Sequence, residues 1–163
     1  MIKIVPATEE HIDQIMEIEN EAISPPWTHG ALLSAIYSDD SYFVAAKDEL
    51  AESFHCPNPC SHPCLDPSAI LGFAILRQVG DDGELLQIAV SRSTRRRGVG
   101  DSLLDDVLQY AIKSKYKSVF LEVRKSNDAA IRLYEKHGFS TLRIRRDYYT
   151  DPIEDANIMA KQI

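Results

Sequence analysis

The stretch from residue 85 to residue 112 constrains the fold of this 163-residue chain more than any other part. A short apolar run at 85–90 is typical of a strand, and it gives way to an arginine-rich turn and then to Gly98 and Gly100. After the glycines, apolar residues recur with the spacing of one helix face. These residues are Leu103, Leu104, Val107, Leu108, Ala111 and Ile112. The pattern predicts a strand, a glycine-containing turn and a helix in direct succession.

A turn of this kind has the properties of an anion-binding site. The first turn of a helix carries unpaired backbone N–H groups and a partial positive charge, and glycine lets a phosphate come close to the backbone. Three consecutive arginines, Arg95, Arg96 and Arg97, add positive charge at the same place. We therefore predict that residues 95–100 hold a diphosphate; the alternative is an ordinary helix start beside a solvated basic turn.

Length and charge narrow the class of protein. The length favours one domain with its own core, which we expect to span residues 1–163. The formal net charge of −7 disfavours direct nucleic-acid binding through a basic surface and suits a cationic substrate. The apolar start of the chain is too short for a signal peptide, and no apolar run approaches the roughly 20 residues that span a membrane. We expect a cytoplasmic protein with no membrane partner.

The remaining elements follow from periodicity and capping signals. Strands are predicted at 2–5, 42–46, 69–79, 118–124, 139–149 and 155–161. Thr8 and Thr28 are typical N-caps of helices, the first with Ile12, Ile15, Met16 and Ala22 on its buried face and the second with Leu32, Leu33 and Ile36. Trp27 lies in the proline-rich connection between the two helices, where it is either a hydrophobic plug or one wall of a substrate groove.

Two polar groups in otherwise apolar segments are candidates for chemistry. Glu122 lies in the middle of the strand at 118–124, and a carboxylate buried there must be paired, hydrated or protonated; the alternative is an exposed or simply paired glutamate. A helix follows, with N-cap residues at 126–128 and a C-terminal glycine, Gly138. Tyr134 shares one face of it with other residues, and periodicity alone assigns it to the core.

A cysteine- and proline-rich insert at about 52–67 stands apart from this pattern. It contains all three cysteines and two of the five histidines, namely His55, Cys56, Cys60, His62 and Cys64. Thiolates and imidazoles are the ligands that zinc favours, but the C-x3-C-x3-C spacing differs from the paired C-x2-C of common zinc ribbons. We expect a solvent-exposed variable loop and no metal, with a loop metal site as the alternative. An odd cysteine count argues against a disulfide framework.

The turn at 95–100, R-R-R-G-V-G, resembles the acetyl-CoA signature Q/R-x-x-G-x-G/A of the GNAT superfamily of N-acetyltransferases. The segment L-E-V-R-K-S-N-D-A-A-I-R-L-Y-E-K-H-G-F at 121–139 resembles the ribosomal-protein-alanine N-acetyltransferase (RimI) family. So do I-A-V at 88–90, R-R-D-Y-Y at 145–149, D-A-N-I-M at 155–159 and Pro26-Trp27. The likeness is strong over about half the chain and weak before Gly72. Gln87 and Asp147 stand where the family commonly has asparagine, and the cysteine-rich insert is outside its usual pattern.

This resemblance implies a fold and a set of roles. The fold would be the α/β (α+β) GNAT fold, a mixed central sheet of six to seven strands splayed in the middle and flanked by about four helices. Glu122 would be the general base and Tyr134 the general acid, with Glu84 on the neighbouring strand as a second possible base. Acetyl-CoA would be held by Ile88, Ala89, Val90, Arg95, Arg96, Arg97, Gly98, Val99, Gly100, Asp101, Ser102 and Asn127. Substrate would contact Trp27, Glu84, Tyr148 and Tyr149.

The residue types suit the chemistry. An α-amine has a pKa of about 8 and a lysine amine one of about 10.4, so both are largely protonated at neutral pH. The acceptor amine must lose a proton before it attacks a thioester, which requires a carboxylate acting directly or through one water. The leaving thiolate is protonated by a group such as a tyrosine hydroxyl, and backbone donors on the split strand stabilise the oxyanion.

We therefore expect an acetyl-CoA-dependent N-acetyltransferase that acts on the N-terminal α-amine of a protein. The resemblance implies the N-terminal alanine of a small-subunit ribosomal protein as the acceptor, and the acidic chain is compatible with a basic ribosomal partner. One alternative is an acetyltransferase of the same fold that acts on small amines, such as polyamines or aminoglycosides. Another is a non-catalytic module that senses CoA or a metal. Activity on peptides that begin with alanine would distinguish the protein N-acetyltransferase from both alternatives.

Overall fold

The computed structural model describes residues 1–48 and 69–163. Seven strands form one sheet in the order β1-β2-β3-β4-β5-β7-β6. All neighbours are antiparallel except the central pair, β4 and β5, which is parallel. The strands are β1 (Ile2–Pro6), β2 (Ser41–Asp48), β3 (Ile70–Val79), β4 (Asp82–Val90), β5 (Ser118–Arg124), β6 (Ser140–Thr150) and β7 (Ile153–Gln162). The predicted strands are confirmed, and so is the mixed sheet of six to seven strands.

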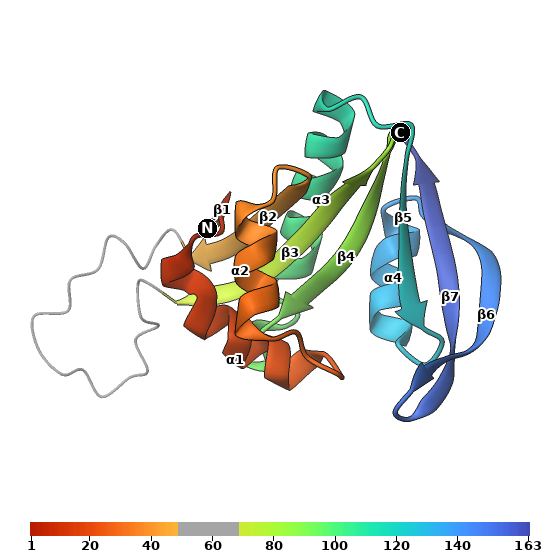
Figure 1. Cartoon of the computed structure of the whole chain (residues 1–163), viewed down its shortest axis with the longest axis horizontal. Helices are drawn as coiled ribbons and strands as arrows, with labels where there is room; N and C mark the ends of the chain where they lie inside the picture. Colours follow the sequence, from red (N-terminus) through yellow and green to blue (C-terminus); the bar gives the residue numbers. More distant parts are fainter. Residues whose placement is uncertain (49–68) are drawn as a thin grey trace, which may run out of the picture.

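Four α-helices cover the two faces of this sheet (Figure 1). They are α1 (Ile12–Ala22), α2 (His29–Tyr37), α3 (Val99–Lys113) and α4 (Asp128–Lys136), with 3-10 turns at Glu9–His11 and Arg92–Thr94. Thr28 caps α2 by accepting a hydrogen bond from Ala31 N at 3.2 Å, as predicted. None of the described helices has the length and apolar character needed to cross a membrane.

The helices bury two separate cores. On one face α3 and α4 pack against the sheet through Leu103, Leu104, Val107, Leu121 and Tyr134 among others. On the other face α1 and α2 pack against inward residues of β2, β3 and β4. Two predicted core positions are wrong. Ile112 is 50% exposed, because it lies about 100° around the helix from the buried Ala111. Ala22 is exposed, and Ile18 and Glu19 occupy the buried face of α1 in its place.

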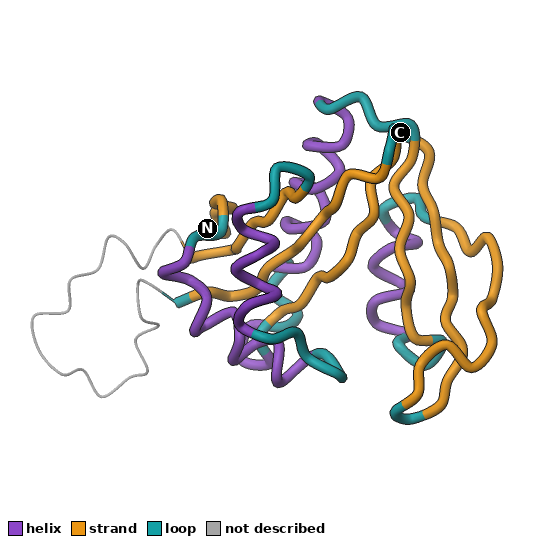
Figure 2. The backbone as a smooth tube through the Cα atoms, viewed as in Figure 1, coloured by secondary structure: helices purple, strands orange, loops and turns teal. Residues whose placement is uncertain are grey.

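The sheet separates between β4 and β5 (Figures 1 and 2). The two strands pair only over Gly83–Leu85 and Val119–Leu121. Immediately beyond this short ladder, the β3–β4 register skips Leu86, so that Leu76 pairs with Leu85 and Ile75 with Gln87. A bulge of this kind bends the strand that carries it. The predicted splay in the middle of the sheet is confirmed, and from Leu86 onward no strand of the described residues pairs with the edge of β4 that faces β5.

The cysteine- and proline-rich insert predicted at about 52–67 lies outside the described residues, and with it the alternative metal ligands His55, Cys56, Cys60, His62 and Cys64. Within the described residues, no group of three or more histidine, cysteine or acidic side chains is arranged to hold a metal ion.

Candidate active site

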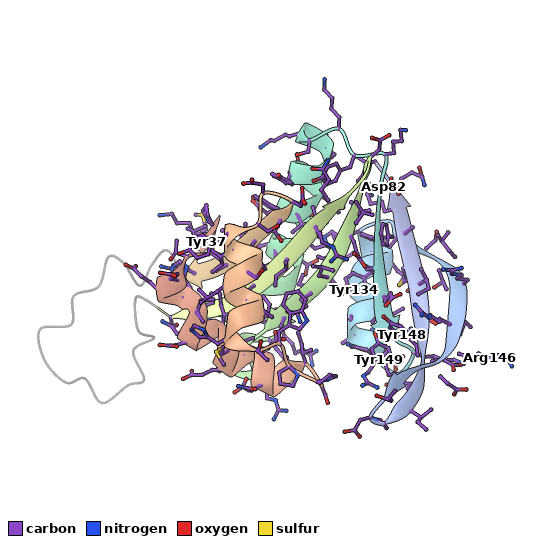
Figure 3. The ribbon with its side chains drawn as sticks, viewed as in Figure 1. Tyr37, Asp82, Tyr134, Arg146, Tyr148 and Tyr149 are labelled. Carbon is purple, nitrogen blue, oxygen red and sulfur yellow. The ribbon has the colours of Figure 1, made fainter. Side chains whose placement is uncertain are left out.

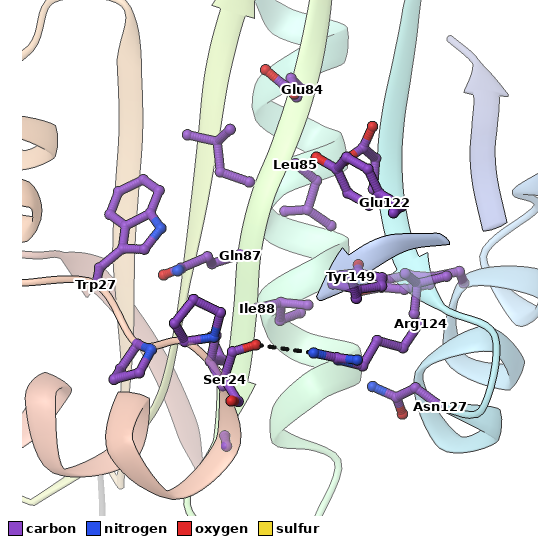
Figure 4. Close-up of a pocket in the computed structure, with 18 residues that line it drawn as sticks. Ser24, Trp27, Glu84, Leu85, Gln87, Ile88, Glu122, Arg124, Asn127 and Tyr149 are labelled. Carbon is purple, nitrogen blue, oxygen red and sulfur yellow. Dashed lines mark hydrogen bonds between the residues drawn. The ribbon is translucent and has the colours of Figure 1, made fainter. Parts of the chain in front are cut away.

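A pocket of about 480 Å³ lies where β4 and β5 separate (Figure 4). Its walls come from the connection between α1 and α2, from β4, from β5 and the start of α4, and from the end of β6. The predicted site residues that line it are Trp27, Glu84, Ile88, Glu122, Asn127, Tyr134, Tyr148 and Tyr149. The fold therefore brings both catalytic candidates and all four substrate candidates to one cavity, although they come from distant parts of the sequence.

Glu122 reaches the pocket because β5 alternates its side chains between two faces. Val119, Leu121 and Val123 are buried in the α3 core, which turns Glu122 to the opposite face. Its side chain is 28% exposed and its Oε1 lies 3.5 Å from Arg145 Nη1. The carboxylate of Glu122 is therefore only partly buried, and it is paired with an arginine. A hydrogen bond to Glu122 also raises the pKa of Tyr148.

Tyr134 both packs in the core and lines the pocket. It is 6% exposed, and its ring lies 5.8 Å from that of Phe139. Burial raises the pKa of Tyr134 well above its ordinary value, so that its hydroxyl stays protonated at neutral pH and is a proton or hydrogen-bond donor. The assignment to the core by periodicity was therefore correct, and it coexists with a position at the pocket. Figure 3 shows Tyr134, Tyr148 and Tyr149 beside the region where β4 and β5 separate.

Arg124 is a pocket residue that the sequence reasoning missed. Its guanidinium lies 4.1 Å from the centre of the Tyr149 ring. It donates to Ser24 O at 3.3 Å, to Asp151 O at 2.9 Å and to Pro152 O at 3.2 Å, the first of which is drawn in Figure 4. It also pairs with Glu154 at 3.3 Å. Its position in the sequence could have indicated this, because Arg124 lies two residues after Glu122 and therefore on the same face of the strand.

The other aromatic and acidic candidates are held by specific partners. Burial, followed by the charge of Glu122, raises the pKa of Tyr149 to about 12. Glu84 forms an ion pair with Arg77 on β3, so this second candidate base is already engaged. Trp27 is half-buried and packs against the α1–α2 core while lining the pocket, which makes it both a plug and a wall.

The glycine turn lies at the start of α3, beyond the end of β4. Gly98 is the N-cap of α3 with φ +83°, a conformation that L side chains rarely adopt. A Cβ placed on Gly98 would meet no atom of the described residues within 4 Å other than its chain neighbours, so there is open space beside this residue. A Cβ on Gly100 would come 3.3 Å from Leu133 Cδ2, so glycine also permits close packing of α3 on α4. These observations fit a site for an anionic group.

The three arginines of this turn and the residues next to them differ in their hydrogen bonds, ion pairs and exposure. Arg96 is exposed with φ +63°, Arg97 forms an ion pair with Asp48 at 2.8 Å, and Arg95 Nε donates to Val90 O at 3.3 Å. Asp101 is paired with Lys136 on α4. The remaining candidates are Val99, which is buried, Ser102, which is partly buried, and Ala89, whose side chain lies in the α1–α2 core.

Asn127 lies in the turn between β5 and α4, and it lines the pocket. Its side-chain oxygen accepts a hydrogen bond from Ala130 N at 3.2 Å and so caps α4, as the sequence predicts. The amide nitrogen is the part of this side chain that remains available as a donor to a ligand.

Known proteins are similar to this chain in both sequence and fold. Residues 12–139 match the acetyltransferase (GNAT) family. The [ribosomal protein bS18]-alanine N-acetyltransferase of Escherichia coli K12 is 46% identical over 93 residues, which are 56% of this chain and 63% of that protein. The Haemophilus influenzae protein of the same name is 30% identical over 151 residues, 91% of this chain and 90% of its own.

Among solved structures, the ribosomal-protein-S18-alanine N-acetyltransferase from Escherichia coli superposes with a TM-score of 0.81 at 31% identity, covering 100% of this chain and 94% of that one. The match to the family spans most of the chain and includes the splayed strands, the glycine turn and α4. The chain therefore belongs to the acetyltransferase (GNAT) family.

Proposed function

We propose that this chain transfers the acetyl group of acetyl-CoA to the N-terminal α-amine of a protein, with the N-terminal alanine of a small-subunit ribosomal protein as acceptor. The observation that carries the proposal is the meeting of Glu122 and Tyr134 at one pocket, a carboxylate on one wall and a protonated phenol on another. The acceptor class rests on the names of the relatives from Escherichia coli and Haemophilus influenzae. We further propose that residues 1–163 form a single domain that works in the cytoplasm.

The glycine turn and the free edge of β4 suit the two parts of the donor. The turn at residues 95–100 would bind the diphosphate, with Asp101 and Ser102 in the following helical turn, because the start of α3 directs N–H groups and positive charge at an anion. Arg95, Arg96 and Arg97 would add charge around it. At Ile88–Val90 the edge of β4 that faces away from β3 pairs with no strand of the described residues, so its amide groups would pair with the pantetheine arm as a strand would. Asn127 would donate to the donor near its thioester end.

Glu122 would act as the general base. It would remove a proton from the acceptor ammonium group, directly or through one water, and the freed nitrogen lone pair would form the new C–N bond at the thioester carbonyl carbon. Arg145 orients the carboxylate by pairing with it. No covalent bond to the enzyme is required, because holding the amine and the thioester side by side supplies much of the rate.

Tyr134 would act as the general acid. When the tetrahedral intermediate collapses, the C–S bond breaks and the sulfur leaves with the electron pair. The hydroxyl of Tyr134 would donate its proton to that sulfur, the acylated nitrogen would lose its second proton to give the neutral amide, and Tyr134 would regain a proton from solvent before the next turnover. Burial keeps the hydroxyl protonated at neutral pH. Backbone N–H groups on the open edge of β4 would stabilise the oxyanion of the intermediate. Trp27, Tyr148 and Tyr149 would form the walls around the acceptor residues.

The test is acetylation of a synthetic peptide that begins with alanine, followed by mass spectrometry. A matched peptide with a blocked N-terminus and an internal lysine is the control. A mass increase of one acetyl group on the free peptide alone supports the proposal. Acetylation only of small amines such as spermidine would replace the proposed acceptor with a different class, and tight donor binding without turnover on any amine would refute enzymatic activity.

A further inference from the structure

A buried glutamate, Glu19, joins three parts of the molecule around the pocket. Its side chain lies on α1 and is 0% exposed. Its Oε1 accepts a hydrogen bond from the backbone N of Trp27 at 2.8 Å and another from Gln87 Nε2 on β4 at 2.9 Å. Trp27 and Gln87 both line the pocket. One carboxyl oxygen thus ties α1 to two separate walls of the cavity.

The remaining side-chain oxygens of Glu19 and Gln87 lack hydrogen-bond donors in the described part of the chain. Glu19 Oε2 and Gln87 Oε1 are both buried, and both lack a hydrogen-bond partner among the described residues. Two oxygen acceptors cannot satisfy each other, and a buried acceptor without a donor is destabilising. One added proton solves this for both atoms. If Glu19 is a neutral acid, its Oε2–H donates to Gln87 Oε1 while Gln87 Nε2 donates to Glu19 Oε1, and a two-way acid–amide pair results.

The surroundings favour the neutral form. Glu19 forms no ion pair within the part of the chain that the structure describes. Burial raises its pKa, and the two hydrogen bonds that it accepts oppose this rise only in part. An isolated charge is costly at such a position, and a group there neutralises instead.

We propose that Glu19 is a positioning residue: as a neutral acid paired with Gln87, it fixes the backbone of Trp27 and thereby the acceptor-side wall of the pocket. Trp27 follows Pro25 and Pro26, whose φ angles are locked, so fixing the amide of Trp27 fixes the end of a stiff segment. The step from a fixed wall to acceptor binding rests on the proposed function; the step from Glu19 to Trp27 does not.

The first experiment needs no activity. Trp27 is the single tryptophan of the chain, so intrinsic fluorescence and its quenching by acrylamide report on this residue alone. Glu19→Gln keeps both acceptor oxygens satisfied, because its amide nitrogen donates to Gln87 Oε1 in place of the acid proton. We expect Glu19→Gln to keep the parent emission maximum, and Glu19→Ala to shift it to longer wavelength with greater quenching. Ile12→Val, a buried change elsewhere on α1, is the control and should leave the emission unchanged.

The second experiment measures kinetics with an alanine-starting peptide. Glu19→Ala should raise the KM for the peptide about tenfold, the factor typical of losing one hydrogen bond. The KM for acetyl-CoA and kcat should change less than about twofold, and Glu19→Gln should restore the parent peptide KM. A general loss of structure would instead affect both substrates. If Glu19→Ala does not fold, Gln87→Ser removes the amide partner of Glu19 instead, and shifts in the same direction but of smaller size are expected, because the bond from Trp27 N to Glu19 remains.

The outcomes separate the ideas. A Glu19→Gln variant that matches Glu19→Ala in emission would overturn the neutral pair, and a Glu19→Ala variant with parent emission would overturn the positioning role. An emission shift with an unchanged peptide KM would overturn the link to the acceptor wall. If neither parent nor variant acetylates any peptide, the proposed function fails, while an emission shift in Glu19→Ala, with parent emission in Glu19→Gln, still supports the positioning of Trp27.

Discussion

The change Glu122→Gln separates catalysis from stability at a single side chain. The amide has the shape of the carboxylate and can still accept a hydrogen bond, but it cannot take a proton from an acceptor ammonium group. If Glu122 is the general base, the loss should therefore fall on turnover. Binding of acetyl-CoA and the fold itself should be almost unaffected.

The structure sets the size of each effect. The only ion pair of Glu122 in the described part of the chain is with Arg145, at 3.5 Å, with side chains 28% and 57% exposed. Solvent screens a pair this exposed, so its loss costs roughly 1 kcal/mol or less in the free energy of unfolding. General-base catalysis typically contributes 10²–10⁴-fold, which corresponds to about 3–5 kcal/mol in the activation free energy. The effect on turnover should clearly exceed the effect on stability.

The assay is the initial rate of thiol release with an alanine-starting peptide, measured between pH 6 and 9, with urea unfolding of the same samples. We expect kcat to fall about 100-fold or more at neutral pH, with the loss shrinking as pH rises and free amine accumulates. Glu84→Gln is the matched control, because Glu84 lines the same pocket but is paired with Arg77. A kcat of Glu122→Gln within threefold of the parent would refute the assignment, and a larger loss in Glu84→Gln would move the base to that residue.

Three further predictions follow from buried groups. Tyr134→Phe should lower kcat about tenfold or more with little change in either KM, and replacing the thioester with one that has a more acidic thiol should rescue it; equal losses for both donors would argue against a general acid. Gly72→Ala should lower the free energy of unfolding in urea by about 1–3 kcal/mol, because its Cβ would meet the backbone oxygen of Ala89 at 2.6 Å; an unchanged midpoint would contradict this. Burial raises the pKa of Glu19 above its ordinary 4.5, so the stability that this group contributes is present below about pH 4.5 and declines as pH rises through its folded-state pKa; Glu19→Gln should lack this decline, and parallel stability curves for parent and variant would show that Glu19 does not titrate in this way.

The order of elements was predictable because each left a local signal. The alternation of β5 and the cap and terminal glycine of α4 marked their positions closely. The sequence also suggested Glu122 as a candidate, because a carboxylate interrupts an apolar run. What local patterns could not give was the pocket itself. Its existence depends on a strand pair that ends after three residues and on a bulge at Leu86, and neither feature has a local sequence signature.

The two misassigned helix positions and the missed residues have physical causes. Periodicity places apolar side chains inside, so it selected Ala22 and Ile112 and passed over Glu19. A buried glutamate becomes acceptable only when a distant strand supplies an amide such as Gln87. Arg124 escaped notice for a similar reason, since its partners are backbone carbonyls from two loops that become neighbours only after folding.

The contacts of Arg124 also bear on how the cavity admits and releases material. One guanidinium bonds the carbonyl of Ser24 on one rim and that of Asp151 on the other. Arg124 therefore links the two rims, and a displacement of either rim disturbs the guanidinium that also bonds the other. Under the proposed function, entry of a peptide end and departure of the acetylated product would therefore require both rims to move together, against the hydrogen bonds of Arg124.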